Sequence, residues 1–103
     1  MEDMKCLMHH LKGEVDDAKC YVKDALAIKG TNPETADLYY RLSGEELTHM
    51  SALHKDAVRM IEEYRREKGE PPEAMMVLYK YLHEQAMDEM ESVGVLREMY
   101  KKM

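Results

Sequence analysis

Residues 38–64 read LYYRLSGEELTHMSALHKDAVRMIEEY and belong to the longest proline-free stretch of the chain. At about 100° per residue, Glu46 and His49 fall inside the apolar face of the helix that this stretch predicts. A carboxylate and an imidazole that are buried without partners destabilise a fold, and a metal ion is the simplest compensation. The apolar face consists of Leu38, Leu42, Leu53, Ala57, Met60 and Tyr64.

The overall composition is that of a helical protein. The 103 residues are 35% charged, include only three prolines and five glycines, and lack both Phe and Trp, which favours helix. This length suits one domain spanning residues 1–103. The net charge of −6 argues against a nucleic-acid partner. No apolar run approaches the roughly 18 residues that span a bilayer, and the acidic start does not resemble a signal peptide. We therefore expect a cytoplasmic protein.

The two cysteines are expected to be reduced thiols. Cys6 and Cys20 lie in the first predicted helix, where about 21 Å of helix would separate them, beyond disulfide reach. The sequence also has no Cys-x-x-Cys pair, which excludes a rubredoxin-type iron site.

Glycine and proline divide the chain into three predicted helices joined by short turns. Gly30 suits the C′ position after the first helix. The second helix begins either with Asn32 as its cap and Pro33 in the first turn, or with a capping box of Thr31 and Glu34. Short turns make successive helices antiparallel neighbours, so the expected fold is an all-α bundle. The predicted helices span about residues 3–29, 33–68 and 72–102.

Each predicted helix carries an inward stripe, and polar residues interrupt two of these stripes. Heptad spacing places Glu14 and Tyr21 in the seam of the first helix, while Gln85 and Glu89 interrupt the stripe of the third. The second helix has an additional apolar stripe, so it is either central in its domain or covered by another chain. These stripes are Met4, Leu7, Leu11, Glu14, Ala18, Tyr21, Ala25 and Ile28; Tyr40, Leu47, Val58 and Ile61; and Met75, Leu78, Leu82, Gln85, Glu89, Val93, Leu96 and Tyr100.

The first two helices are expected to bring three candidate metal ligands together. Glu14 and Glu46 lie sixteen residues on either side of the intervening glycine, so an antiparallel hairpin places them at one height. His49 follows one turn after Glu46, and Tyr21 lies about two turns nearer the loop, opposite Tyr39. This donor set suits iron or manganese, and zinc would also bind. The competing interpretation is a metal-free polar layer in which Glu46 and His49 pair with each other or with Tyr21.

The spacings Glu14-x6-Tyr21 and Glu46-x2-His49 resemble those of the ferritin-like superfamily, specifically its rubrerythrin-like branch, over about residues 4–64. The resemblance implies that Glu14 is a terminal ligand, that Glu46 bridges two irons and that His49 completes the ligand set. It implies that Tyr21 lies close enough to hydrogen-bond a ligand. The implied activity is oxidation of Fe(II) by dioxygen or peroxide, as in a ferroxidase.

The chain departs from that family in supplying only half of a site. Gln85 stands where a second Glu would be expected and Ser92 where a second Tyr would be, and no second Glu-x-x-His follows. A two-fold homodimer would assemble four carboxylates and two imidazoles around two irons. This is similar to encapsulated ferritin-like proteins, although residues 98–103 do not resemble the apolar address of those cargo proteins. Since the four-cysteine iron domain of rubrerythrins has no counterpart, iron handling or oxidative-stress defence outranks a self-contained peroxidase.

Other residues leave alternatives open. His10 could be an accessory ligand beside Glu14, and Asp17 could form an entry site for iron, but exposed positions are favoured for both. Glu89 or Gln85 could reach the site from the third helix. His54 and His83 are expected to be ordinary surface or interface residues, and the eleven methionines to fill the core. The alternative function is a metal-free interaction or assembly protein that uses the second apolar stripe of the middle helix. A ferritin-like relic without metal is a third possibility.

Overall fold

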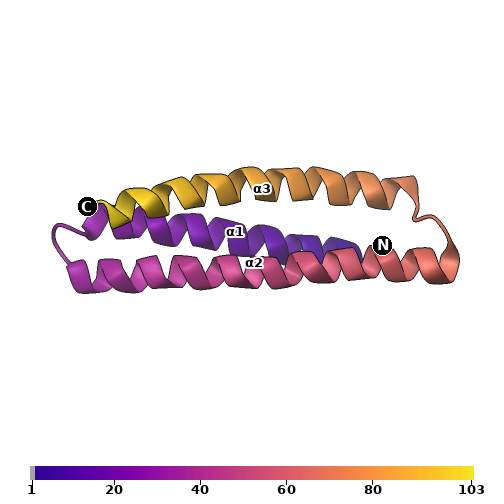
Figure 1. The fold of residues 1–103 in the computed structure, drawn as a ribbon, viewed down its shortest axis with the longest axis horizontal. Helices are drawn as coiled ribbons and strands as arrows, with labels where there is room; N and C mark the ends of the chain where they lie inside the picture. Colours follow the sequence, from indigo (N-terminus) through magenta and orange to yellow (C-terminus); the bar gives the residue numbers. More distant parts are fainter. Residues whose placement is uncertain (1) are drawn as a thin grey trace.

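The computed structural model describes residues 2–103, and over this range the chain folds into three helices and no strands. The helices run antiparallel in succession and form a rod about 55 Å long and 18 Å wide (Figure 1). The C-terminus lies beside the α1–α2 loop (Figure 1). The all-α bundle is confirmed, and the predicted helix bounds agree with the structure to within one residue. The helices are α1 (Glu2–Ile28), α2 (Pro33–Lys68) and α3 (Glu73–Lys101).

Helix α2 begins in the first of the two predicted ways. The side chain of Asn32 accepts a hydrogen bond of 3.3 Å from the N–H of Thr35, and Pro33 opens the helix. Thr31 is not a capping residue, because its hydroxyl donates to the carbonyl of Ile28.

Glycine acts at the second turn rather than the first. Helix α1 ends at Ile28, whose carbonyl accepts hydrogen bonds from the N–H groups of Thr31 and Asn32 at 3.0 and 2.7 Å. Gly30 follows the end of the helix as predicted, but it does not adopt the positive φ that favours glycine at C′. Within residues 2–103, the left-handed glycine is Gly69, with φ 86°, where the chain leaves α2.

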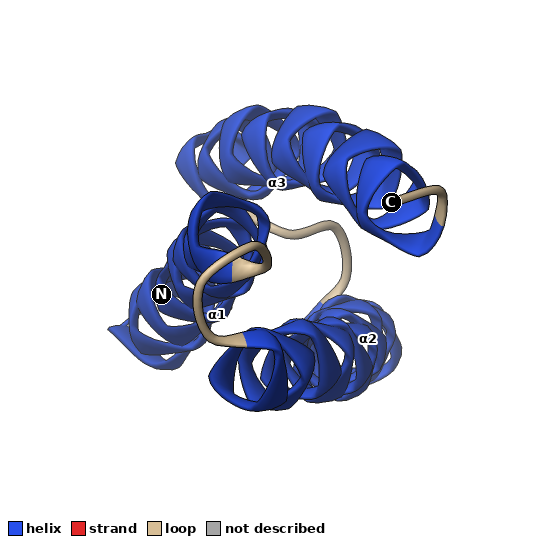
Figure 2. Cartoon of the chain, turned by 90° about the vertical axis from the view of Figure 1, so that its left-hand side faces the viewer, coloured by secondary structure: helices blue, strands red, loops and turns tan. Residues whose placement is uncertain are grey.

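Helix α1 packs along both other helices, while the backbones of α2 and α3 approach each other at few points (Figure 2). Because two helices cover α1, its buried surface is wider than one heptad seam. The seam prediction missed a second buried line and overestimated the burial of the edge that contains Glu14, which is only half-buried. The buried lines are Met4, Leu11, Ala18 and Ala25, and Met8, Val15 and Val22; the half-buried edge is Leu7, Glu14, Tyr21 and Ile28.

The chain's own α3 covers the second apolar stripe of α2. The ring of Tyr40 stacks on that of Tyr100 with centroids 4.6 Å apart, and Ile61 is buried. The stripe is therefore occupied within the chain. On the main face, Leu38 was predicted to be a core residue but is 40% exposed. Ala57 is buried as predicted, and α2 also buries Ala36, Ser43 and Met50, which the prediction did not include.

The guanidinium of Arg97 ties α3 to α2 near the C-terminus. It donates a hydrogen bond of 2.6 Å to the carbonyl of Tyr40 and a second one to the Ser43 hydroxyl. It also lies 4.0 Å from the centroid of the Tyr40 ring. Gly44 makes room for it, since a Cβ there would lie 3.0 Å from a guanidinium nitrogen.

The inward stripe of α3 differs from the prediction at its centre. Gln85 is exposed and donates a hydrogen bond of 2.9 Å to the Tyr81 hydroxyl, while Ala86 is buried in its place. An α-helix drifts from a strict seven-residue repeat, which explains the shift by one residue. The prediction that methionines fill the core is confirmed in part: Met4, Met8, Met50 and Met75 are buried, and Met60, Met76 and Met90 pack against them. Met99 and Met103 are exposed, so for these two the prediction is wrong.

None of the helices within residues 2–103 combines the length and apolar character needed to cross a membrane.

Candidate metal centre

Glu14 of α1 and Glu46 and His49 of α2 lie close together between the two helices. One potential ligand atom from each lies within 4.8 Å of the other two. The Nδ1 of His49 is 3.5 Å from a carboxylate oxygen of Glu14 and 3.5 Å from one of Glu46. The structure thus brings together the three residues that the sequence singled out, although their role as ligands stays a prediction.

The burial of the three side chains is graded from the core to the rim. The side chain of Glu46 is 16% exposed, that of Glu14 is 29% exposed and that of His49 is 56% exposed. His49 therefore lies at the edge of the apolar face and not inside it, so its predicted burial is wrong.

Glu46 is the least satisfied member of the cluster. Its Oε2 is buried and has no hydrogen-bond partner within the described residues, because the 3.5 Å separation from His49 Nδ1 does not make a hydrogen bond. A buried acceptor without a donor costs free energy, and a second carboxylate beside it adds repulsion. In the part of the chain that the structure describes, the one side chain that could bring positive charge to the two carboxylates is His49, and a single imidazolium cannot balance both of them.

The separations fit coordination of a metal ion. Ligand atoms about 2.1 Å from a tetrahedral ion lie about 3.4 Å from each other, close to the two 3.5 Å separations that involve His49. Atoms up to 4.8 Å apart can share one ion after a small side-chain movement, or can bridge two ions. Carboxylate and imidazole donors together suit first-row divalent metals.

The cluster lies on the face of the α1–α2 pair that α3 leaves uncovered. On α1, Lys19 reaches α3 through an ion pair of 2.8 Å with Glu89, whereas Glu14 lies at the opposite edge of the buried surface. On α2, Tyr40 and His54 contact α3, and both lie roughly 100° around the helix from Glu46. Figure 2 shows α3 packed over the other side of the hairpin.

Tyr21 lies along this uncovered face but away from the three residues. It follows Glu14 by seven residues, which is about 10 Å along the helix. Its ring packs against Tyr39 with centroids 6.0 Å apart, as the hairpin register predicts. Its proposed hydrogen bond to a ligand stays a prediction.

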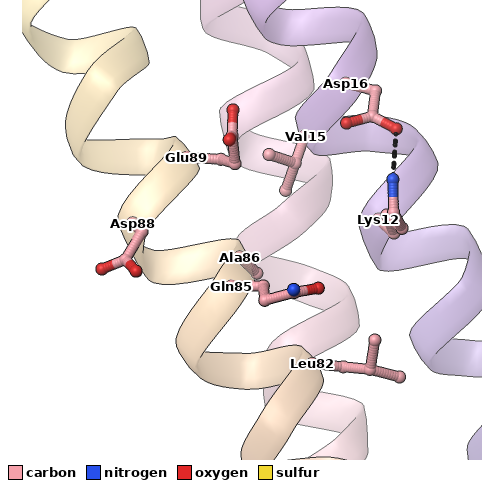
Figure 3. Close-up of a pocket in the computed structure, with 8 residues that line it drawn as sticks. All are labelled: Lys12, Val15, Asp16, Leu82, Gln85, Ala86, Asp88 and Glu89. Carbon is pink, nitrogen blue, oxygen red and sulfur yellow. Dashed lines mark hydrogen bonds and ion pairs between the residues drawn. The ribbon is translucent and has the colours of Figure 1, made fainter.

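Helix α3 does not complete the site within one chain. Glu89 pairs with Lys19, and Gln85 bonds to Tyr81. Both line a groove of about 360 Å³ between α1 and α3 (Figure 3). This groove also holds the Lys12–Asp16 ion pair of 2.9 Å, and these two residues lie about 200° around α1 from Glu14.

The sequence interpretation missed a cluster of rings between α2 and α3. His54 and His83, expected at the surface or an interface, are half-buried and stack with centroids 4.7 Å apart. The hydroxyl of Tyr79 lies 3.3 Å from Nε2 of His54. The i,i+4 spacing of Tyr79 and His83 was the available signal, but nothing in the sequence pairs them with His54.

Both cysteines are free and exposed, as predicted. The neighbouring carboxylate of Asp24 raises the pKa of the Cys20 thiol, so Cys20 is not an activated nucleophile.

Comparison of the chain with protein-family models, curated proteins and solved structures finds no match.

Proposed function

We propose that this chain is a ferritin-like metal protein that binds Fe(II) at Glu14, Glu46 and His49. As a homodimer it would oxidise that iron with dioxygen or peroxide, in iron handling or oxidative-stress defence. The observation that carries the proposal is the buried Oε2 of Glu46, which has no hydrogen-bond donor and lies beside a second carboxylate. Manganese or zinc would satisfy the same donors.

A cation explains why these side chains stay together. The two carboxylates carry two negative charges, and a neutral imidazole balances neither. Even a protonated His49 would leave one negative charge unbalanced. A divalent ion removes the repulsion and satisfies the orphan oxygen at once. Bound iron supplies one-electron chemistry toward dioxygen or peroxide.

The three candidate ligands differ in burial, and each has a different role in the proposed site. Glu46, the most buried of the three, fixes the ion against the helix pair, and Glu14 balances its charge from α1. His49 at the rim offers a nitrogen donor to an ion arriving from solvent. Its Nε2 then remains for a hydrogen bond that sets the orientation of the ring.

The exposed face around the cluster supports assembly of a complete site from two chains. Three ligands leave a first-row metal coordinatively unsaturated, and two copies related by a two-fold axis would provide four carboxylates and two imidazoles for two irons. Half-buried apolar side chains flank the ligands on this face, and a second hairpin would cover them. They are Leu7, Tyr21 and Ile28 of α1 and Tyr39, Leu42 and Leu53 of α2.

The alternative of a metal-free interaction protein has less support. It relied on the second apolar stripe of α2 as a docking surface, and α3 of the same chain covers that stripe at Tyr40 and Ile61.

The test is a metal count on protein purified from iron-supplemented cells. We expect about one iron per chain in the wild type, and none in Glu46→Ala or His49→Ala. Glu45→Ala is the matched control, because Glu45 is an exposed carboxylate next to Glu46, and it should retain full metal content. Circular dichroism should show equal helicity in all four proteins. Full metal content in either ligand variant would refute the assignment.

A further inference from the structure

Three aromatic side chains join α2 to α3 on the side of α2 away from the metal cluster. The rings of His54 and His83 stack at 4.7 Å with an interplanar angle of 29°. Tyr79 packs on His83 at 5.4 Å and lies 3.3 Å from Nε2 of His54 through its hydroxyl. Since the backbones of α2 and α3 approach each other at few points (Figure 2), such side chains supply much of the contact there.

The surroundings of this cluster favour neutral imidazoles. Nδ1 of His83 is buried and has no hydrogen-bond partner within the described residues. A protonated imidazole donates from both nitrogens, so a charged His83 would carry a buried N–H without an acceptor. Burial, followed by repulsion from His83, lowers the pKa of His54, and burial raises the pKa of Tyr79.

No carboxylate balances a charge on either ring. Within residues 2–103, the ion pairs of histidine are both those of His49. On α2, the nearest carboxylate in the sequence is Asp56, which is bound to Arg59 at 2.7 Å. On α3, Lys80 and Glu84 flank the rings and are exposed. At this end of the bundle α1 contributes apolar methionines to the core.

We propose that His54 and His83 form an acid-sensitive latch, which holds α3 against α2 while both rings are neutral and releases it when they take up protons. Two positive charges cannot share a half-buried stack at this separation without a counter-ion. The hydroxyl of Tyr79 can turn to accept from a protonated His54, so that hydrogen bond survives. The unbalanced charge and the orphan donor on His83 open the latch.

The direction of the pH dependence follows from linkage. In the open state, His54 regains the ordinary pKa of about 6.5, which burial and the neighbouring ring lower in the closed state. As the pH falls through that value, the open state binds protons before the closed state does, and closure loses stability. The latch is therefore fully closed above about pH 7.5 and weakens below about pH 6.5. For each unit by which closure lowers the pKa of a histidine, the equilibrium constant for opening in acid rises about tenfold.

Hydrogen exchange of the metal-free protein at pH 7.5 and pH 5.0 tests this. After correction for the intrinsic exchange rate, amides of residues 73–87 in the wild type should open at least about tenfold more in acid. The His54→Gln/His83→Gln variant should change less than about twofold, because glutamine does not titrate. His9→Gln/His10→Gln is the matched control, since these are also two neighbouring rings but exposed, and it should behave like the wild type. All three proteins keep His49.

Equal acid-induced opening in the wild type and the His54→Gln/His83→Gln variant would overturn the latch. A second measurement does not depend on the variant folding. Proton NMR of the wild-type imidazoles should show His54 titrating below pH 6.5. If His54 titrates at or above that pH, the latch is refuted. Since neither readout involves metal, a failed iron count would leave this inference unaffected.

Discussion

Replacing Glu46 with glutamine should stabilise the metal-free protein and abolish its stabilisation by metal. Glutamine has nearly the same shape as glutamate, but it carries no charge and brings two N–H donors. One of these can bond to the carboxylate of Glu14, which lies within 4.8 Å. Most substitutions of partly buried residues destabilise a protein. A gain in stability would therefore indicate that the substitution relieves repulsion between two carboxylates that lack their metal ion.

The magnitude follows from the separation of the two carboxylates. At 4.8 Å, the upper limit of that separation, two unit charges repel by about 0.9 kcal/mol at a dielectric constant of about 80 and by about 3.5 kcal/mol at about 20. With 29% and 16% of their side chains exposed, Glu14 and Glu46 lie between these limits, and we expect a gain of about 1–2 kcal/mol. For a domain of this size, that raises Tm by at least about 4 °C.

Thermal unfolding with EDTA and with excess Mn²⁺ or Zn²⁺ measures both effects. A metal at about 100 times its Kd should stabilise the wild type by about 2.7 kcal/mol. The order of stability should therefore reverse: Glu46→Gln is more stable in EDTA, and the wild type is more stable in metal. Glu45→Gln, an exposed neighbour, should change stability by less than about 0.5 kcal/mol in either condition.

Two results would refute the reasoning. If Glu46→Gln is less stable than the wild type in EDTA, then a protein group absent from the described contacts holds the carboxylate. If the variant still gains stability from metal as the wild type does, Glu46 is not a ligand.

Three further predictions concern the fold and the assembly. In urea unfolding, Gly94→Ala should stabilise the protein by about 0.5–1 kcal/mol through helix propensity, because a Cβ there meets nothing within 4 Å. Gly44→Ala should bring no gain, because its Cβ would lie 3.0 Å from the Arg97 guanidinium. Burial raises the pKa of Tyr100 to about 12, so stability should fall as the pH rises from about 10 toward 12, and Tyr100→Phe should flatten that decline. Leu42→Glu on the uncovered face should yield monomers in light scattering, while Val77→Glu, an exposed apolar position on α3, should leave the dimer intact.

The fold was largely predictable because its helix boundaries are marked by residues at the boundaries themselves. Pro33 and the glycine and prolines at residues 69–72 mark helix boundaries by their own backbone chemistry. The exception was Gly30, where the helix closed on the Ile28 carbonyl before the glycine was needed. Which side chains would be buried was harder to predict. A heptad describes contact with one partner, but α1 has two, so Met8, Val15 and Val22 escaped the prediction.

The candidate metal cluster was predictable for a geometric reason. In an antiparallel hairpin with a short loop, distance from the turn determines which residues meet, so Glu14 and Glu46 could be paired by counting. The turn between α2 and α3 is also short, but their backbones approach each other at few points, so height alone does not say which of their side chains touch. The stack of His54 on His83 and the ion pair of Lys19 with Glu89 therefore became visible only in three dimensions.

The position of α3 is compatible with the proposal that two chains assemble the metal site together. In this bundle α3 meets the hairpin on the side away from Glu46, and its Glu89 is held by an ion pair with Lys19 of α1. Removing Lys19 would break its ion pair with Glu89, but Glu89 would still not reach Glu46, because α1 lies between them. The third helix thus stabilises the hairpin from one side and leaves the ligand-bearing side free. A second hairpin, with its own glutamates and histidine, is the element that this free side can accommodate.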